Sequence, residues 1–131
     1  EGVPEDNVEA VKWYRLAAEQ GYTTAQFALG WMYDQGEGVP QDDAEAVKWY
    51  RLAAEQGDAG AQFFLGLMYR QGEGVPEDNV YAYMWWNIAA SQGHANASTN
   101  KEEVERRMSQ SEIAEAQRLS RECVARDYKD C

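Results

Sequence analysis

Apolar and polar side chains follow each other along the start of this chain with the period of a helix. Between residues 10 and 18 the apolar positions are three and four residues apart, which places them on one helix face, while Lys12 and Arg15 fall on the other. Residues 46–54 show the same pattern. The apolar positions are Ala10, Trp13, Tyr14, Ala17 and Ala18 in the first stretch and Ala46, Trp49, Tyr50, Ala53 and Ala54 in the second. Each stretch is predicted to form an amphipathic helix.

The sequence around this helix is itself repeated. The segment EGVPEDNVEAVKWYRLAAEQG begins at Glu1, EGVPQDDAEAVKWYRLAAEQG begins at Glu37, and EGVPEDNVYAYMWWNIAASQG begins at Glu73, so the period is 36 residues. A period of this length is typical of helical repeat arrays, in which each unit buries its apolar face only by stacking on its neighbours.

Start and stop signals divide each repeat into two helices. The predicted N-caps of the first helix are Asp6, Asp42 and Asp78, with Glu9 and Glu45 placed to complete capping boxes. The predicted stops are Gly21, Gly57 and Gly93 for the first helix and Gly36 and Gly72 for the second. Gly30 and Gly66 lie inside the second helix, where we expect them to let two helices approach closely. Each repeat therefore predicts one helical hairpin.

These blocks resemble a known repeat family. The segment AQFALGWMYDQGEGVPQDDAEAVKWYRLAAEQG is similar to the Sel-1-like repeats, relatives of the tetratricopeptide repeats, and the resemblance is strong over residues 1–93. It implies an all-α, right-handed solenoid of antiparallel helical hairpins that serves as a scaffold for protein partners, without catalysis.

Composition and charge narrow the classes of partner. The net charge of −11 is spread along the chain and leaves no basic stripe for a phosphate backbone, so we expect no nucleic-acid binding. A basic or neutral protein surface is the better electrostatic complement. No apolar run reaches the length needed to span a membrane.

The two ends of the array differ from its middle. The first helix has no hairpin before it, so Glu1 is expected to be a cut edge, and the open face of this helix is a candidate for end-to-end self-association. In the third copy the exposed face becomes apolar through Tyr81, Tyr83, Met84, Trp86 and Asn87. We therefore expect repeats over residues 1–36, 37–72 and 73–93 onward, and a C-terminal cap over residues 94–131.

This cap is predicted to contain two helices. A degenerate helix spans residues 97–108, and a capping box over residues 109–112 opens the terminal helix. The positions of the terminal helix available for packing are Ile113, Ala116, Leu119, Ser120, Cys123 and Val124.

Cys123 and Cys131 are the only cysteines in the chain. A disulfide between them would hold the C-terminal tail against the cap and would favour an oxidising location, periplasmic in a bacterium or secreted. Two free thiols in a cytoplasmic protein are the alternative.

Residues able to do chemistry are few. His94, the only histidine, follows a helix-stopping glycine, where we expect a solvated loop or C-cap role. Ser98 and Lys101 match the Ser-x-x-Lys pattern of penicillin-recognising enzymes, but no Ser-Asp-Asn or Lys-Thr-Gly accompanies them. We expect no catalytic residue, no cofactor and no metal.

The second helices of the repeats carry the candidate binding residues. By the tetratricopeptide register they line the inner, concave wall, where copies one and two differ in size and charge at 28/64, 31/67 and 34/70. The predicted wall also holds Thr24, Gln35, Gly60, Gln71, Thr99, Glu103, Arg106 and Arg107. The candidate partner-binding residues are Phe27, Trp31, Asp34, Phe63, Leu67 and Arg70.

The sequence thus favours a non-catalytic module that binds a peptide or protein segment on its concave face. Two alternatives remain open at this point: a β-lactam hydrolase or penicillin-binding activity based on Ser98 and Lys101, and a passive spacer within a longer array.

Overall fold

The computed structural model describes residues 4–131, and Glu1 therefore lies outside the described part. Seven helices and no strand occur within residues 4–131. They are α1 (Pro4–Glu19), α2 (Thr23–Gln35), α3 (Asp43–Ala54), α4 (Ala59–Gln71), α5 (Asn79–Ser91), α6 (Ala95–Glu105) and α7 (Gln110–Ala125).

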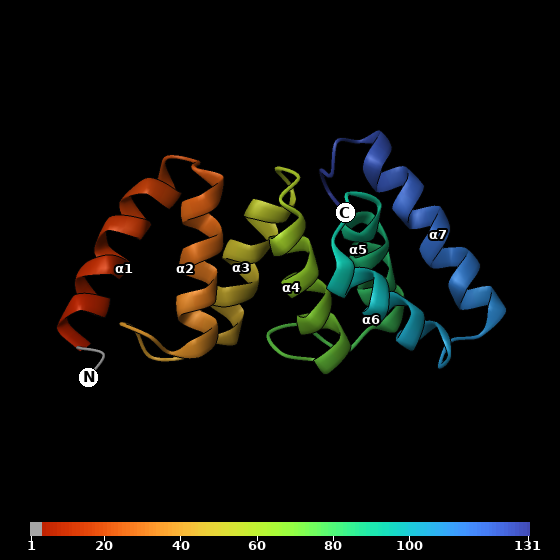
Figure 1. Ribbon diagram of the computed structural model, residues 1–131, viewed down its shortest axis with the longest axis horizontal. Coiled ribbons are helices and arrows are strands. Elements are labelled where there is room, and N and C mark those ends of the chain that lie inside the picture. Colours follow the sequence, from red (N-terminus) through yellow and green to blue (C-terminus); the bar gives the residue numbers. More distant parts are fainter. Residues whose placement is uncertain (1–3) are drawn as a thin grey trace.

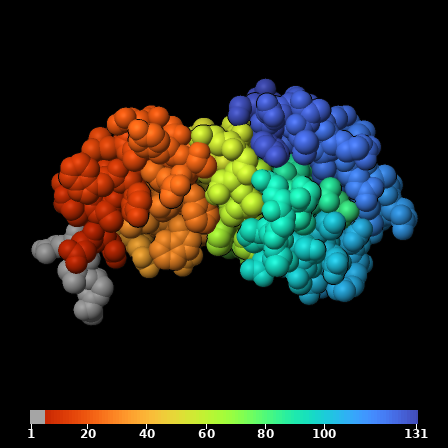
Figure 2. Space-filling view, turned by 45° about the horizontal axis from the view of Figure 1, so that its top comes forward, coloured from red at the N-terminus to blue at the C-terminus, as the bar shows by residue number. Residues whose placement is uncertain are grey.

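The helices stack in chain order as antiparallel hairpins (Figure 1). Each helix packs on the next from α1 to α6, and α7 packs against α5. The result is an elongated body with α1 at one end and the α5–α7 group at the other (Figure 2). The all-α helical solenoid expected from the repeat is confirmed.

The turn between hairpins is held by the same contacts in both complete copies. Gly36 and Gly72 end α2 and α4 in the left-handed conformation, at φ 71° and 69°. The Asp42 and Asp78 side chains then cap the next helix, as expected. The backbone N–H groups of the same two residues donate to the carbonyl oxygens of Tyr33 and Tyr69, at 3.0 and 2.8 Å.

Asp6 does not have the predicted capping role. It lies inside α1, which begins at Pro4, and Glu9 consequently closes no capping box. The physical reason is that α1 already begins at Pro4, and Pro is well suited to the first turn of a helix.

The two mid-helix glycines confirm the expected close packing, and in both the nearest contact is an aromatic ring of the next helix. A Cβ on Gly30 would lie 2.8 Å from the ring of Tyr50, and a Cβ on Gly66 would overlap the indole of Trp86. Trp86 therefore points back toward α4, and the expectation that it lies on the outer face of the third copy is wrong. Its Nε1 donates to the Phe63 carbonyl at 3.0 Å.

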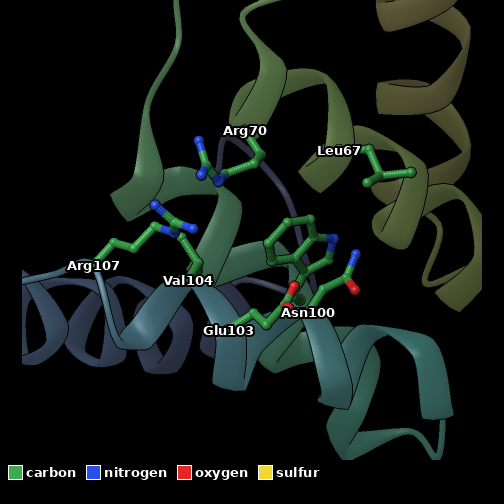
Figure 3. Close-up of a pocket in the computed structure, with 7 residues that line it drawn as sticks. Leu67, Arg70, Asn100, Glu103, Val104 and Arg107 are labelled. Carbon is green, nitrogen blue, oxygen red and sulfur yellow. The ribbon is translucent and has the colours of Figure 1, made fainter.

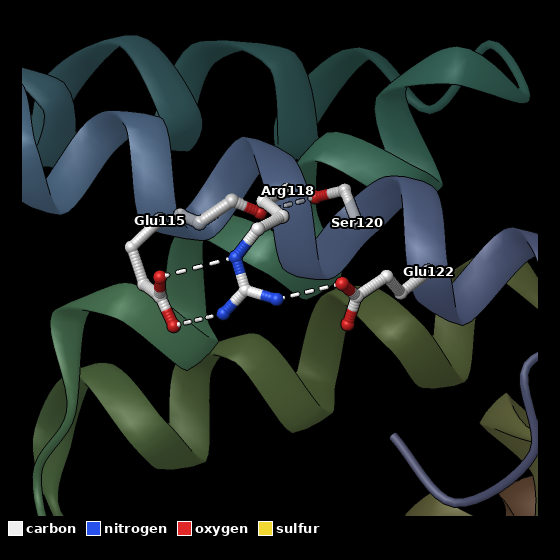
Figure 4. Close-up of polar contacts among 5 residues, drawn as sticks. Glu115, Arg118, Ser120 and Glu122 are labelled. Atoms are coloured by element: carbon white, nitrogen blue, oxygen red, sulfur yellow. Dashed lines mark hydrogen bonds and ion pairs between the residues drawn. The ribbon is translucent and has the colours of Figure 1, made fainter.

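The terminal helix covers the last repeat. Ser109 and Glu112 form the predicted capping box, and Ala116, Ser120 and Cys123 are buried. Val124, expected to pack, is 48% exposed and borders an open hollow with Ile88 and Ser91 of α5. The outer face of α7 is polar, since Arg118 pairs with Glu115 and Glu122 at 2.7 and 2.6 Å (Figure 4). A polar outer face is what the last unit of a repeat array needs.

The C-terminal tail folds back along the array. Cys123 and Cys131 form a disulfide with their Cα atoms 5.4 Å apart. Beyond α7, the Lys129 ammonium donates to the Glu55 carbonyl at 2.8 Å, and the Tyr128 ring lies beside Gly57. The tail thus ties the cap to the turn between α3 and α4. Within the described residues, no helix has the length and apolar character that crossing a membrane requires.

Two tryptophans at the same repeat position have different environments. Trp49 is 4% exposed among residues of α1 and α2, whereas Trp13 is 63% exposed. Val8, Leu16 and Tyr22 are also exposed at this end.

This difference predicts different costs for one substitution. Trp49→Ala should lower the free energy of unfolding by about 3–5 kcal/mol because it leaves a cavity. Trp13→Ala should cost less than about 1 kcal/mol, as expected at an exposed position. Urea unfolding followed by circular dichroism measures both, and equal losses would contradict the assignment of Trp49 to the core.

Candidate partner-binding surface

Four of the six residues expected to bind a partner line two separate hollows, one between α1, α2 and α4 and the other between α4, α5 and α6. We call the first the apolar pocket; it measures about 400 Å³ and is lined by Tyr14, Thr24, Phe27, Ala28, Trp31, Met32 and Phe64. We call the second the arginine pocket; it measures about 210 Å³ and is lined by Leu67, Arg70, Trp86, Asn100, Glu103, Val104 and Arg107 (Figure 3).

The apolar pocket exists because the two repeats differ at one position. In the second copy the Phe64 ring stacks on Tyr50, with ring centroids 5.5 Å apart and planes 18° apart. Ala28 occupies the equivalent position of the first copy, so the ring of Tyr14 has no such cover. The methyl group of Ala28 leaves open the volume that a phenyl ring fills one repeat later.

Two of the six candidate residues shape this pocket. Phe27 is half-buried and packs against Tyr50 and Phe64, with ring centroids 5.8 and 5.7 Å apart. Trp31 is 37% exposed at the pocket wall. Phe27 therefore has both a core role and a surface role, while Trp31 offers an aromatic edge to solvent.

Asp34 and Phe63 line neither pocket. Asp34 accepts a hydrogen bond from the Tyr50 hydroxyl at 3.0 Å. Burial raises the pKa of the Asp34 carboxyl, the bond from Tyr50 partly offsets this rise, and Asp43 adds to it. Burial and the Asp34 carboxylate raise the pKa of Tyr50 as well. The pair is an internal contact of the first two repeats.

Phe63 packs between helices. Its ring stacks on His94 with centroids 4.8 Å apart and lies near Phe64 and Trp86. His94 caps the N-terminus of α6, where its Nδ1 accepts from the Ala97 N–H at 3.1 Å. The expected loop or C-cap role of His94 is therefore wrong: in its repeat position, shared with Asp58, the ring nitrogen takes the place of a carboxylate oxygen.

Leu67 and Arg70 line the arginine pocket. Arg70 forms an ion pair with Glu77 at 3.1 Å. Glu103 and Arg107 of the predicted wall also contribute, but Arg106 and Thr99 do not. Tyr14, Asn100, Trp86 and Ala28 were not among the candidate residues from the sequence. For Ala28 a signal was available, namely the 28/64 difference between the two copies.

Ser98 and Lys101 show no catalytic arrangement. The Lys101 ammonium donates to the Asn87 side chain at 3.3 Å and lies over the ring of Tyr83, rather than bonding Ser98. Within the described residues, no group of three His, Cys, Asp or Glu side chains could hold a metal ion.

Comparison with known proteins gives one family. The Sel1 repeat model matches residues 1–22, 23–58 and 59–94. No curated protein matches the chain by sequence.

Two solved structures are similar in fold. A protective antigen of uropathogenic Escherichia coli strains, displaying an SLR fold, is 34% identical over 96% of this chain, with a TM-score of 0.92. A Sel1 repeat protein from Oxalobacter formigenes is 40% identical over 72% of this chain, with a TM-score of 0.69. The present chain covers 28% and 39% of the lengths of those two chains.

The Asp34 and Tyr50 contact predicts a pH dependence of stability. Folding raises the pKa of Asp34. Its contribution to the free energy of unfolding is therefore fully present below the pKa of the unfolded state, and it is lost as the pH rises through the pKa of the folded state. Asp34→Asn keeps an oxygen that accepts from Tyr50, so it should reduce the loss of stability between about pH 4 and pH 7. Urea unfolding at both pH values measures this. Glu102→Gln, on the exposed side of α6, is the control, and parallel losses in Asp34→Asn and wild type would refute the prediction.

Proposed function

Since the chain belongs to the Sel1 repeat family, whose members generally act as protein-interaction scaffolds, we propose that it binds a peptide or protein segment along α2, α4 and α6, without catalysis. The apolar pocket is the observation that carries this proposal. It combines a partly exposed tryptophan with a hollow large enough for an apolar side chain. Aromatic side chains at such hollows are the usual anchors of protein interfaces.

In this proposal Phe27 and Trp31 receive an apolar side chain of the partner, and Leu67 and Arg70 contact the segment farther along. Asp34 and Phe63 hold the helices that carry these contacts. The binding surface thus begins at the first two repeats and continues to α6, while α7 closes the end of the array.

The disulfide supports an oxidising location, periplasmic or secreted. The exposed face around Trp13 supports association with a further Sel1 hairpin, either of a longer chain or of a second copy. A penicillin-directed activity has less support, because Lys101 is engaged with Asn87. The spacer alternative does not account for the open apolar pocket.

The second repeat shows which substitution should fill the apolar pocket. Ala28→Phe reproduces the residue found at position 64, so the new ring should stack on Tyr14 without destabilising the fold. Affinity for a peptide selected against the protein from a displayed library should fall at least about 30-fold, as expected when a central anchor is excluded. Titration calorimetry measures the affinity, and the melting temperature checks the fold.

Leu52→Phe is the control, since it adds the same ring at an exposed position of α3. Trp31→Ala should also weaken binding, by about 2 kcal/mol. Unchanged affinity in a folded Ala28→Phe protein would move the partner away from the apolar pocket.

A further inference from the structure

The arginine pocket arises from a paired exchange between repeats. In the first pair of hairpins, Asp34 of α2 accepts a hydrogen bond from Tyr50 of α3. One repeat later Arg70 and Trp86 stand at these positions. The internal hydrogen bond between Asp34 and Tyr50 therefore has no counterpart here, because the indole of Trp86 offers no acceptor to the guanidinium of Arg70.

Trp86 cannot compensate in another way. Its Nε1–H is already donated to the Phe63 carbonyl, and its ring fills the space above Gly66. Among residues 4–131, Arg70 pairs only with Glu77, whose side chain is 60% exposed in the turn before α5. Exposed ion pairs of this kind contribute little and exchange readily, so Arg70 keeps donors for another acceptor.

Arg107 brings a second guanidinium to the same hollow. In the part of the chain that the structure describes, the Arg107 side chain forms no hydrogen bond and no ion pair. Figure 3 shows the guanidinium groups of Arg70 and Arg107 pointing toward each other, with Asn100 and Glu103 across the pocket. Two cations are thus brought together in a chain whose net charge is −11.

The remaining lining defines what the cations could bind. Leu67 provides a half-buried apolar wall, Val104 and the indole of Trp86 form the pocket's base at 2% exposure each, and the Asn100 amide adds a polar group. A guanidinium matches a carboxylate through two parallel hydrogen bonds. The volume of about 210 Å³ admits a short stem carrying one such group. Glu103 adds a negative charge that favours a single carboxylate over an anion of higher charge.

We propose that the arginine pocket binds one carboxylate of a peptide, with Arg70 and Arg107 as its two charged donors and Leu67 beside the adjoining methylene groups. This assignment rests on the proposed peptide-binding function and adds the chemistry of a second contact, separate from the apolar pocket. The carboxylate can come from an acidic side chain or from a chain end.

Nuclear magnetic resonance titration of the whole chain tests the proposal through the Nε signals of the arginines and the indole signal of Trp86. The probes are N-acetyl-Leu-Glu-amide, with a side-chain carboxylate, and N-acetyl-Leu-Gln with a free C-terminus. N-acetyl-Leu-Gln-amide is the neutral match, and inorganic phosphate is the second anion. At least one carboxylate probe should shift the Arg70, Arg107 and Trp86 signals saturably, and which one does so identifies the source. The neutral probe should shift none of them.

Substitutions distinguish binding in the arginine pocket from non-specific electrostatic attraction of the probe to arginine side chains. Arg70→Gln and Arg107→Gln should each raise the dissociation constant about fivefold, whereas Arg106→Gln, one residue outside the pocket, should leave it unchanged. Equal losses in all three variants, or shifts by phosphate but by neither carboxylate, would overturn the assignment. So would the absence of any shift. Each of these results leaves the apolar pocket untouched, because that contact is tested by Ala28→Phe with a selected peptide.

Discussion

The array depends on one kind of contact, in which an aromatic ring of one helix packs against a glycine inside the preceding helix. Tyr50 lies over Gly30 between the first and second hairpins, and Trp86 lies over Gly66 between the second and third. A mid-helix glycine costs about 1 kcal/mol in helix propensity. The ring buried against it more than offsets that cost, since a large aromatic residue buried in this way contributes several kcal/mol. Successive hairpins are thereby held at one fixed separation.

The fixed stack explains where the copies are free to differ. Positions that hold the helices together, such as Gly30 and Gly66, are the same in both copies, while 28/64 and 34/70 differ in size and charge. These exchanges produce a hollow in one repeat and, in the next, an arginine that pairs with the exposed Glu77 at the edge of a second hollow. Differences in surface shape and charge along α2, α4 and α6 therefore arise without any change in the framework.

Much of the fold was predictable because the signals are local and repeated. Asp42, Asp78, Gly36 and Gly72 act at helix ends, where the residue type alone decides the conformation. The Asp6 cap was predicted wrongly because α1 already begins at Pro4. Side chains that depend on several helices were harder to predict: Trp86 faces α4, Val124 stays half-exposed, and Phe63 packs between helices while Phe27 and Trp31 line the apolar pocket. No periodicity within one helix encodes which neighbour fills a hollow.

The sign of one stability change tests the stacking contact most directly. In a solvent-exposed helix, Gly→Ala raises the free energy of unfolding by about 1 kcal/mol. In Gly30→Ala the added methyl would lie 2.8 Å from the Tyr50 ring, so urea unfolding should instead show a loss of about 1–3 kcal/mol. A Gly30→Ala protein more stable than wild type would contradict the account, because the ring and the glycine would then not set the distance between hairpins.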